Sequence, residues 1–127
     1  MTRMIFTAPP TKKQKEIYNL VLKAQLSAIK GISSGITGRK ADSLARNIIE
    51  KAGYGKNYGH AGGHGVGLDI HESPSLSEKY TSRLKANSII TIEPGIYIEG
   101  EFGIRIEDMI LLTKTGNKNL TSLPKTI

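Results

Sequence analysis

The sequence predicts an α+β domain with two helices in its first half and an antiparallel sheet in its second. Two early segments repeat apolar residues at helical spacing, whereas from residue 54 onward the chain is rich in glycine and then in β-branched residues. Helices that precede the strands, instead of alternating with them, favour an α+β layer. The 127 residues form one domain at most and are enough for a real core.

The helical segments have recognisable starts and stops. Residues 1–6 predict a short strand, which a turn at 8–11 connects to the first helix, with Thr11 as its N-cap and Gly31 as its stop. Thr37 or Gly38 caps the second helix, which stops at Ala52-Gly53. The predicted apolar faces are Ile17, Leu20, Val21, Ala24 and Ala28 on the first helix, and Ala41, Leu44, Ala45, Ile48 and Ile49 on the second.

The second half predicts short strands separated by turns. The strands are expected at 88–93, 96–98, 104–112 and 119–121, with turns at 99–101 and 115–117. Because alternate residues share a face, Ile104, Ile106 and Ile110 should enter the core, with Arg105, Glu107 and Met109 on the other face. A hairpin across 94–103 would then bring Glu93 and Glu107 together.

Composition limits the classes of function. There is no cysteine, which excludes a disulfide framework and a thiolate metal site. No apolar run approaches the roughly 20 residues of a membrane helix, and residues 1–6 are too short for a signal-peptide core, so a cytoplasmic protein is expected. The net charge of +7 comes from scattered lysines and arginines. This pattern favours a solvated face, or a surface that meets an acidic partner, over nucleic-acid binding.

All three histidines, His60, His64 and His71, lie among glycines within twelve residues. Imidazole and carboxylate ligands suit zinc, manganese, iron and cobalt. If the segment is extended, His60 and His64 share a face. With Glu93 and Glu107, the sequence therefore predicts a metal site built from one imidazole and two carboxylates.

Three motifs follow one another in the second half of the chain. They are Gly-His-Gly-Val-Gly-Leu-Asp-Ile-His-Glu at 63–72, Ile-Glu-Pro-Gly-Ile-Tyr at 92–97 and Gly-Ile-Arg-Ile-Glu-Asp at 103–108. In this order and spacing they resemble the pita-bread metallopeptidases. The resemblance is greatest to the proline-specific branch, aminopeptidase P and prolidase, and the third motif favours this branch over the methionine aminopeptidases. The resemblance implies the carboxy-terminal half of that fold, two helices packed on a curved antiparallel sheet. It also implies an exopeptidase for peptides with proline at the second position.

The resemblance implies two divalent metals held by five protein ligands, with manganese first and cobalt or zinc as alternatives. His64 would be the imidazole ligand, Glu93 the carboxylate that also contacts the attacking water, and Glu107 the bridging carboxylate. Three further residues would serve catalysis. His60 would lie near the substrate, His71 would help bind the scissile region, and Arg105 would orient the site.

The chain also departs from the family pattern. The other two ligands are aspartates, the second normally just before a segment like Met1-Thr2-Arg3. Residues 1–127 are thus expected to be a partial catalytic domain without its amino-terminal half and both aspartates, weakly active or inactive alone. Asp42, Asp69 and Asp108 do not fit the missing roles. Ala61-Gly62, where the family has Gly followed by Thr, Ser or Leu, is expected to loosen the loop around His60.

Other interpretations remain open beside the enzyme. His64 can be a buried histidine in a turn, Glu93 and Glu107 surface carboxylates, and Arg105 a neutralising partner of Glu107. The tyrosines are assigned to packing: Tyr54, Tyr58, Tyr80 and Tyr97. The chain can then be a non-catalytic interaction module that pairs with itself, a piece complemented by a separate amino-terminal half, or an RNA binder.

Overall fold

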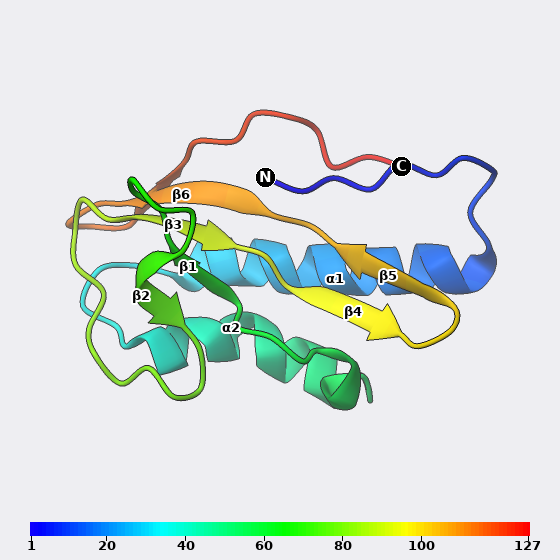
Figure 1. The fold of residues 1–127 in the computed structure, drawn as a ribbon, viewed down its shortest axis with the longest axis horizontal. Coiled ribbons are helices and arrows are strands. Elements are labelled where there is room, and N and C mark those ends of the chain that lie inside the picture. The colour runs from blue at the N-terminus through cyan, green and yellow to red at the C-terminus, as the bar shows by residue number, and fades with distance from the viewer.

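The computed structural model describes residues 1–127 and shows two helices packed on an antiparallel sheet (Figure 1). Helix α1 (Lys12–Gly31) packs against α2 (Gly38–Lys51) and also on strands of the sheet. The core lies between these layers, where isoleucines of both layers are fully buried. The predicted α+β class is therefore confirmed. No helix combines the length and apolar character that crossing a membrane requires.

Both helices begin where the sequence predicts. Thr11 accepts a hydrogen bond from the Gln14 backbone N–H while the Gln14 side chain accepts one from Thr11, a complete capping box. Thr37 caps α2 by accepting from the backbone N–H of Lys40. Most of the predicted apolar faces are buried, with Leu20, Leu44 and Ile48 packed more partially at the edge of the core. The turn after α2 contains a short 3₁₀ helix, η1 (Gly55–Asn57).

The strands form one main sheet and one hairpin. The main sheet is antiparallel in the order β2-β1-β3-β6-β7, and the hairpin pairs β4 with β5. The bounds are β1 (Gly63–Gly65), β2 (Glu72–Leu76), β3 (Ile89–Ile92), β4 (Gly95–Ile98), β5 (Phe102–Arg105), β6 (Asp108–Leu112) and β7 (Asn117–Asn119). In Figure 1 the β4–β5 hairpin continues outward from β3 and β6, over α1.

The predicted single strand at 104–112 is wrong, because it is two strands in different sheets. β5 ends at Arg105, β6 begins at Asp108, and the bond from the Ile106 N–H to the Pro94 carbonyl (3.4 Å) lies at the break. Pro94 has no N–H to donate and interrupts the facing strand at the same level. The chain bends here and places Glu93 and Glu107 at the junction.

Two smaller predictions at the chain ends are also wrong. Residues 1–6 form no strand, because only Thr2 pairs with the sheet, by a single bridge to Glu107. The last strand is 117–119 instead of 119–121. The terminal segments instead run beside each other (Figure 1), with Arg3 donating to the carbonyls of Leu123 and Pro124.

The predicted alternation in the 104–112 region is confirmed on both sides of the break. Ile104, Ile106 and Ile110 are at most 1% exposed. Asp108 is also fully buried, where it accepts hydrogen bonds from Arg3 and Asn119 (both 2.7 Å) and pairs with Lys125. Burial alone would raise the pKa of Asp108, but the hydrogen bonds, above all those from Lys125 and Arg3, hold this pKa below its usual value.

Replacing Asp108 with asparagine is expected to lower the free energy of unfolding by about 2–3 kcal/mol, because the partly buried Arg3 and Lys125 lose their charged acceptor. Urea denaturation measures the change. Glu101→Gln removes one member of the exposed Lys13–Glu101 pair and should change stability by less than about 1 kcal/mol. Equal effects in the two variants would contradict the assignment of Asp108 as the buried anchor of both chain ends.

Candidate metal centre

The residues predicted to form the site meet where the hairpin leaves the main sheet. His64 lies in β1, Glu93 directly follows β3, and Arg105 ends β5. Glu107 lies between β5 and β6, and His71 directly precedes β2. Each of these positions is at or beside a strand end, so the sheet fixes the backbone that carries each side chain.

His64 and Glu93 are in direct contact. His64 Nε2 lies 3.1 Å from Glu93 Oε1, and both side chains are largely shielded from solvent. Thr91 joins them, because its hydroxyl donates to Glu93 Oε1 and accepts from the His64 backbone N–H, both at 3.0 Å. On the other edge of the ring, Nδ1 lies 2.9 Å from the Gly65 carbonyl oxygen.

This arrangement fits a metal ligand. The Gly65 carbonyl can only accept, so Nδ1 carries a hydrogen and Nε2 faces the carboxylate of Glu93. A histidine whose Nδ1 is fixed by a carbonyl is the usual form of a metal-binding imidazole. The imidazole nitrogen and the carboxylate oxygen that face each other here are both atoms that bind divalent metals. The donor pair of His64 and Glu93 therefore suits an imidazole–carboxylate metal such as zinc or manganese.

Arg105 and Glu107 are connected through Thr2, a residue that the sequence analysis did not single out. The Thr2 hydroxyl donates to Glu107 Oε2 at 2.6 Å and accepts from Arg105 Nε at 3.2 Å. Arg105 Nη1 lies 3.7 Å from Glu93 Oε2, so Arg105 forms its ion pair with Glu93 and not directly with Glu107. The amine of Met1 lies 3.3 Å from the other oxygen of Glu107. In this conformation no three His, Asp or Glu side chains come close enough to hold an ion by themselves.

The other two histidines lie on different sides of this centre. The exposed His71 ring lies against His64, with ring centroids 4.3 Å apart. His60 contacts tyrosines instead, since its Nε2 lies 3.1 Å from the Tyr97 hydroxyl and its ring packs edge-on against Tyr58. The structure thus brings His71 against His64 and holds His60 against Tyr97.

The sequence assigns Tyr97 to packing, but its hydroxyl also contacts His60. Its side chain faces His60, and cross-strand Gly103 leaves room for the ring, because a Cβ there would lie 2.7 Å from it. Burial raises the pKa of Tyr97, although the neighbouring Arg105 opposes this change. Strand alternation could have found this residue, since Tyr97 shares the outer face of the hairpin with Arg105.

Comparison with known proteins decides the family. The sequence profile of metallopeptidase family M24 matches residues 1–114. The chain belongs to this family. An Xaa-Pro dipeptidase of Pyrococcus horikoshii is 51% identical over 121 residues, 95% of this chain and 34% of the relative.

Solved structures give the same result. The Xaa-Pro dipeptidase from Bacillus anthracis superposes with a TM-score of 0.96 at 49% identity, covering 98% of this chain and 35% of that one. The prolidase from Pyrococcus furiosus gives 0.95 at 47% identity, covering 97% and 36%. The present chain therefore spans about a third of the length of these relatives. Its two helices and antiparallel sheet correspond to the carboxy-terminal part of the pita-bread fold, as the resemblance implies.

Proposed function

We propose that this chain forms the carboxy-terminal part of the active site of a proline-specific metal-dependent exopeptidase, an Xaa-Pro aminopeptidase or dipeptidase. The observation that carries the proposal is the His64–Glu93 contact, with Nδ1 of His64 fixed by a carbonyl. Membership of a metallopeptidase family supports a divalent metal, and the relatives named as Xaa-Pro dipeptidases support the substrate class.

His64, Glu93 and Glu107 are proposed as metal ligands. Two divalent ions, manganese first with cobalt or zinc as alternatives, would lower the pKa of a shared water and polarise the peptide carbonyl. Glu93, whose Oε1 accepts a hydrogen bond from the Thr91 hydroxyl, would accept a proton from that water. Thr2 holds the Glu107 carboxylate by donating to Oε2.

Three other residues are proposed to act on the substrate or on the ligands. His71, exposed beside His64, can donate a hydrogen bond to the developing oxyanion. Arg105 orients Glu93 by pairing with its second oxygen. His60 contacts the substrate from the side of Tyr97.

The substrates proposed are peptides with proline at the second position, hydrolysed in the cytoplasm. The 127 residues hold three of the five ligands that the resemblance implies. The two aspartates would come from an amino-terminal half, in the same chain or a separate one, or from a second copy. We therefore expect the 127-residue protein alone to hold metal weakly and to hydrolyse Xaa-Pro peptides slowly or not at all.

Calorimetric titration of the metal-free protein with Mn²⁺ and Zn²⁺, run beside an Xaa-Pro hydrolysis assay and a mass measurement, tests this expectation. Weak binding with little turnover, and hydrolysis that appears when an aspartate-bearing half from a related prolidase is added, would support the proposal. Rapid hydrolysis by the 127-residue protein as a monomer would contradict the missing-ligand account. Failure to bind either metal, with and without the added half, would contradict the metal site itself.

One observation favours a second function, a non-catalytic module that associates with another copy. Leu68 is fully exposed and Ile70 is 74% exposed, in the loop just before His71. Neighbouring exposed apolar side chains favour association. A concentration-dependent dimer that binds no metal would support this module, whereas a strict monomer at high concentration would contradict it.

A further inference from the structure

The segment that carries His60 is attached to helix α2 by a buried ion pair. Asp42 and Arg46 lie one turn apart on α2 and are 1% and 9% exposed. Arg46 Nε lies 2.5 Å from Asp42 Oδ2, and Nη2 donates to Oδ1 at 3.0 Å, the forked geometry of an arginine on a carboxylate. Because desolvation offsets much of the attraction in such a pair, it adds little stability compared with apolar side chains. Both members of the pair also bond to the backbone of the loop that follows α2.

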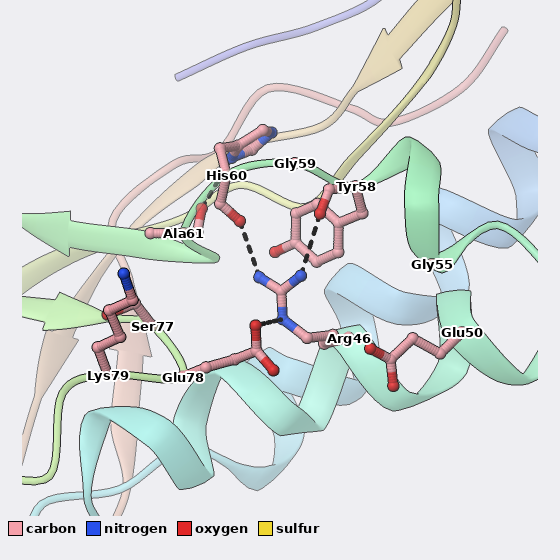
Figure 2. Close-up of a pocket in the computed structure, with 10 residues that line it drawn as sticks. All are labelled: Arg46, Glu50, Gly55, Tyr58, Gly59, His60, Ala61, Ser77, Glu78 and Lys79. Atoms are coloured by element: carbon pink, nitrogen blue, oxygen red, sulfur yellow. Dashed lines mark hydrogen bonds and ion pairs between the residues drawn. The ribbon is translucent and has the colours of Figure 1, made fainter.

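What it holds is the backbone on both sides of Gly59. Arg46 Nη1 donates to the Tyr58 carbonyl at 3.0 Å, and Nη2 donates to the His60 carbonyl at 2.8 Å. Figure 2 shows the guanidinium between α2 and this loop, with both bonds directed at the loop. The same guanidinium lies over the Tyr58 ring, 4.2 Å from its centroid. One side chain thus fixes two carbonyls and the aromatic ring that flanks His60.

Asp42 fixes the loop one step further along. The Gly62 N–H is shared between the Leu76 carbonyl, at 2.7 Å, and Asp42 Oδ1, at 3.0 Å. The Gly62 carbonyl accepts from the Glu93 N–H at 2.9 Å. A Cβ at residue 62 would lie 3.0 Å from both Asp42 Oδ1 and the Tyr58 hydroxyl, so glycine allows the close approach. From the sequence, Ala61-Gly62 is expected to loosen the loop. In the structure, glycine at 62 lets the Asp42 carboxylate reach the backbone N–H of this residue.

The contacts of Arg46 and Asp42 with the loop also fix the position of the His60 ring. Its edges lie 2.8 Å from the Ala61 carbonyl and 3.1 Å from the Tyr97 hydroxyl, and its centroid lies 5.1 Å from that of Tyr58. A loop with glycine at 59 and 62 has too much backbone freedom to hold a side chain in one place unaided. We propose that Arg46, oriented by Asp42, is a positioning residue that sets the His60 ring on the substrate side of the site. The inference rests on the proposed function only for the substrate-side role of His60.

Arg46→Lys is the informative substitution, because lysine keeps the charge but its three N–H donors on one nitrogen cannot reproduce the four bonds of the Arg46 guanidinium. The 127-residue protein is labelled at its histidine rings and examined by NMR, and amide hydrogen exchange is recorded on the same sample. We expect the His60 ring signals to shift and broaden while those of His64 and His71 stay in place. We also expect Gly62 amide exchange to accelerate, by less than about tenfold because the Leu76 carbonyl still accepts from this N–H, while amides in α1 and β6 keep their protection.

Asp42→Asn serves as the milder variant, since it leaves the arginine bonds to the loop available and should affect Gly62 exchange more than the His60 ring. Glu78→Gln is the matched control, because Glu78 also approaches Arg46 (3.9 Å) but is 71% exposed, and it should change neither signal. A folded Arg46→Lys protein with unchanged His60 signals and Gly62 exchange would overturn the proposal. A uniform change in all histidine signals and all amides would also overturn it, because Arg46 would then support the whole fold and not His60 in particular. Neither readout depends on metal or on turnover, so failure of the proposed peptidase activity would be seen separately, in the titration and the assay.

Discussion

Replacing Gly63 with alanine is expected to lower the free energy of unfolding by more than about 4 kcal/mol, the range reached by severe overpacking. A Cβ on residue 63 would lie 2.0 Å from the Thr91 carbonyl oxygen and 2.8 Å from its carbon. Both are backbone atoms of β3, so no side-chain rotation can relieve the clash. β1 would have to move away from β3 and take His64 away from Thr91 and Glu93.

The free energies of unfolding of Gly63→Ala and Gly59→Ala, measured by urea denaturation, are compared to isolate the steric effect of the added Cβ. A Cβ on Gly59, four residues earlier, meets nothing within 4 Å, so that variant should stay within about 1 kcal/mol of the parent. Equal stability of Gly63→Ala and the parent protein would mean that β1 and β3 lie farther apart than the structure places them.

The helices could be predicted from the sequence because their determinants are local. Thr11 and Thr37 cap the backbone within three residues, and the apolar face repeats within one turn. The same reasoning missed Asp42 and Arg46 as buried residues. Their spacing of four suggests a helical ion pair, but such pairs are usually on the solvated face, and only the loop at 58–62 buries this one.

The strand at 104–112 could not be placed correctly because its break is set by another strand. The apolar alternation continues through Ile104, Ile106 and Ile110, and nothing local interrupts it. Pro94 ends the facing ladder, and β5 leaves β6 there to follow β4. The break matters for function, because Glu93 and Glu107 lie at it. The motifs located these carboxylates, but the connection of Glu107 to Arg105 through Thr2 spans more than a hundred residues and needs the folded chain.

Replacing Glu93 with glutamine is expected to lower the affinity for Mn²⁺ or Zn²⁺ by more than about 100-fold. Loss of a hydrogen-bond partner of a ligand already lowers metal affinity about 10- to 100-fold, and here the charged donor itself is lost. Glutamine keeps the length of the side chain and an oxygen that can accept from Thr91, so the fold and the position of His64 should persist. Calorimetric titration of the metal-free protein, paired with the added aspartate-bearing half so that the parent binds tightly, measures the change.

Glu101→Gln is the matched control, since it removes the same charge from an exposed carboxylate of the β4–β5 turn that pairs only with Lys13. Its metal affinity should equal that of the parent protein. His64→Gln should resemble Glu93→Gln, because each removes one member of the facing pair. Glu107→Gln should have a smaller effect on the first ion, because Thr2 and the Met1 amine engage that carboxylate in this conformation. If Glu93→Gln and Glu101→Gln bind metal equally well, the ion is held elsewhere, and the His64–Glu93 pair is an ordinary hydrogen-bonded ion pair.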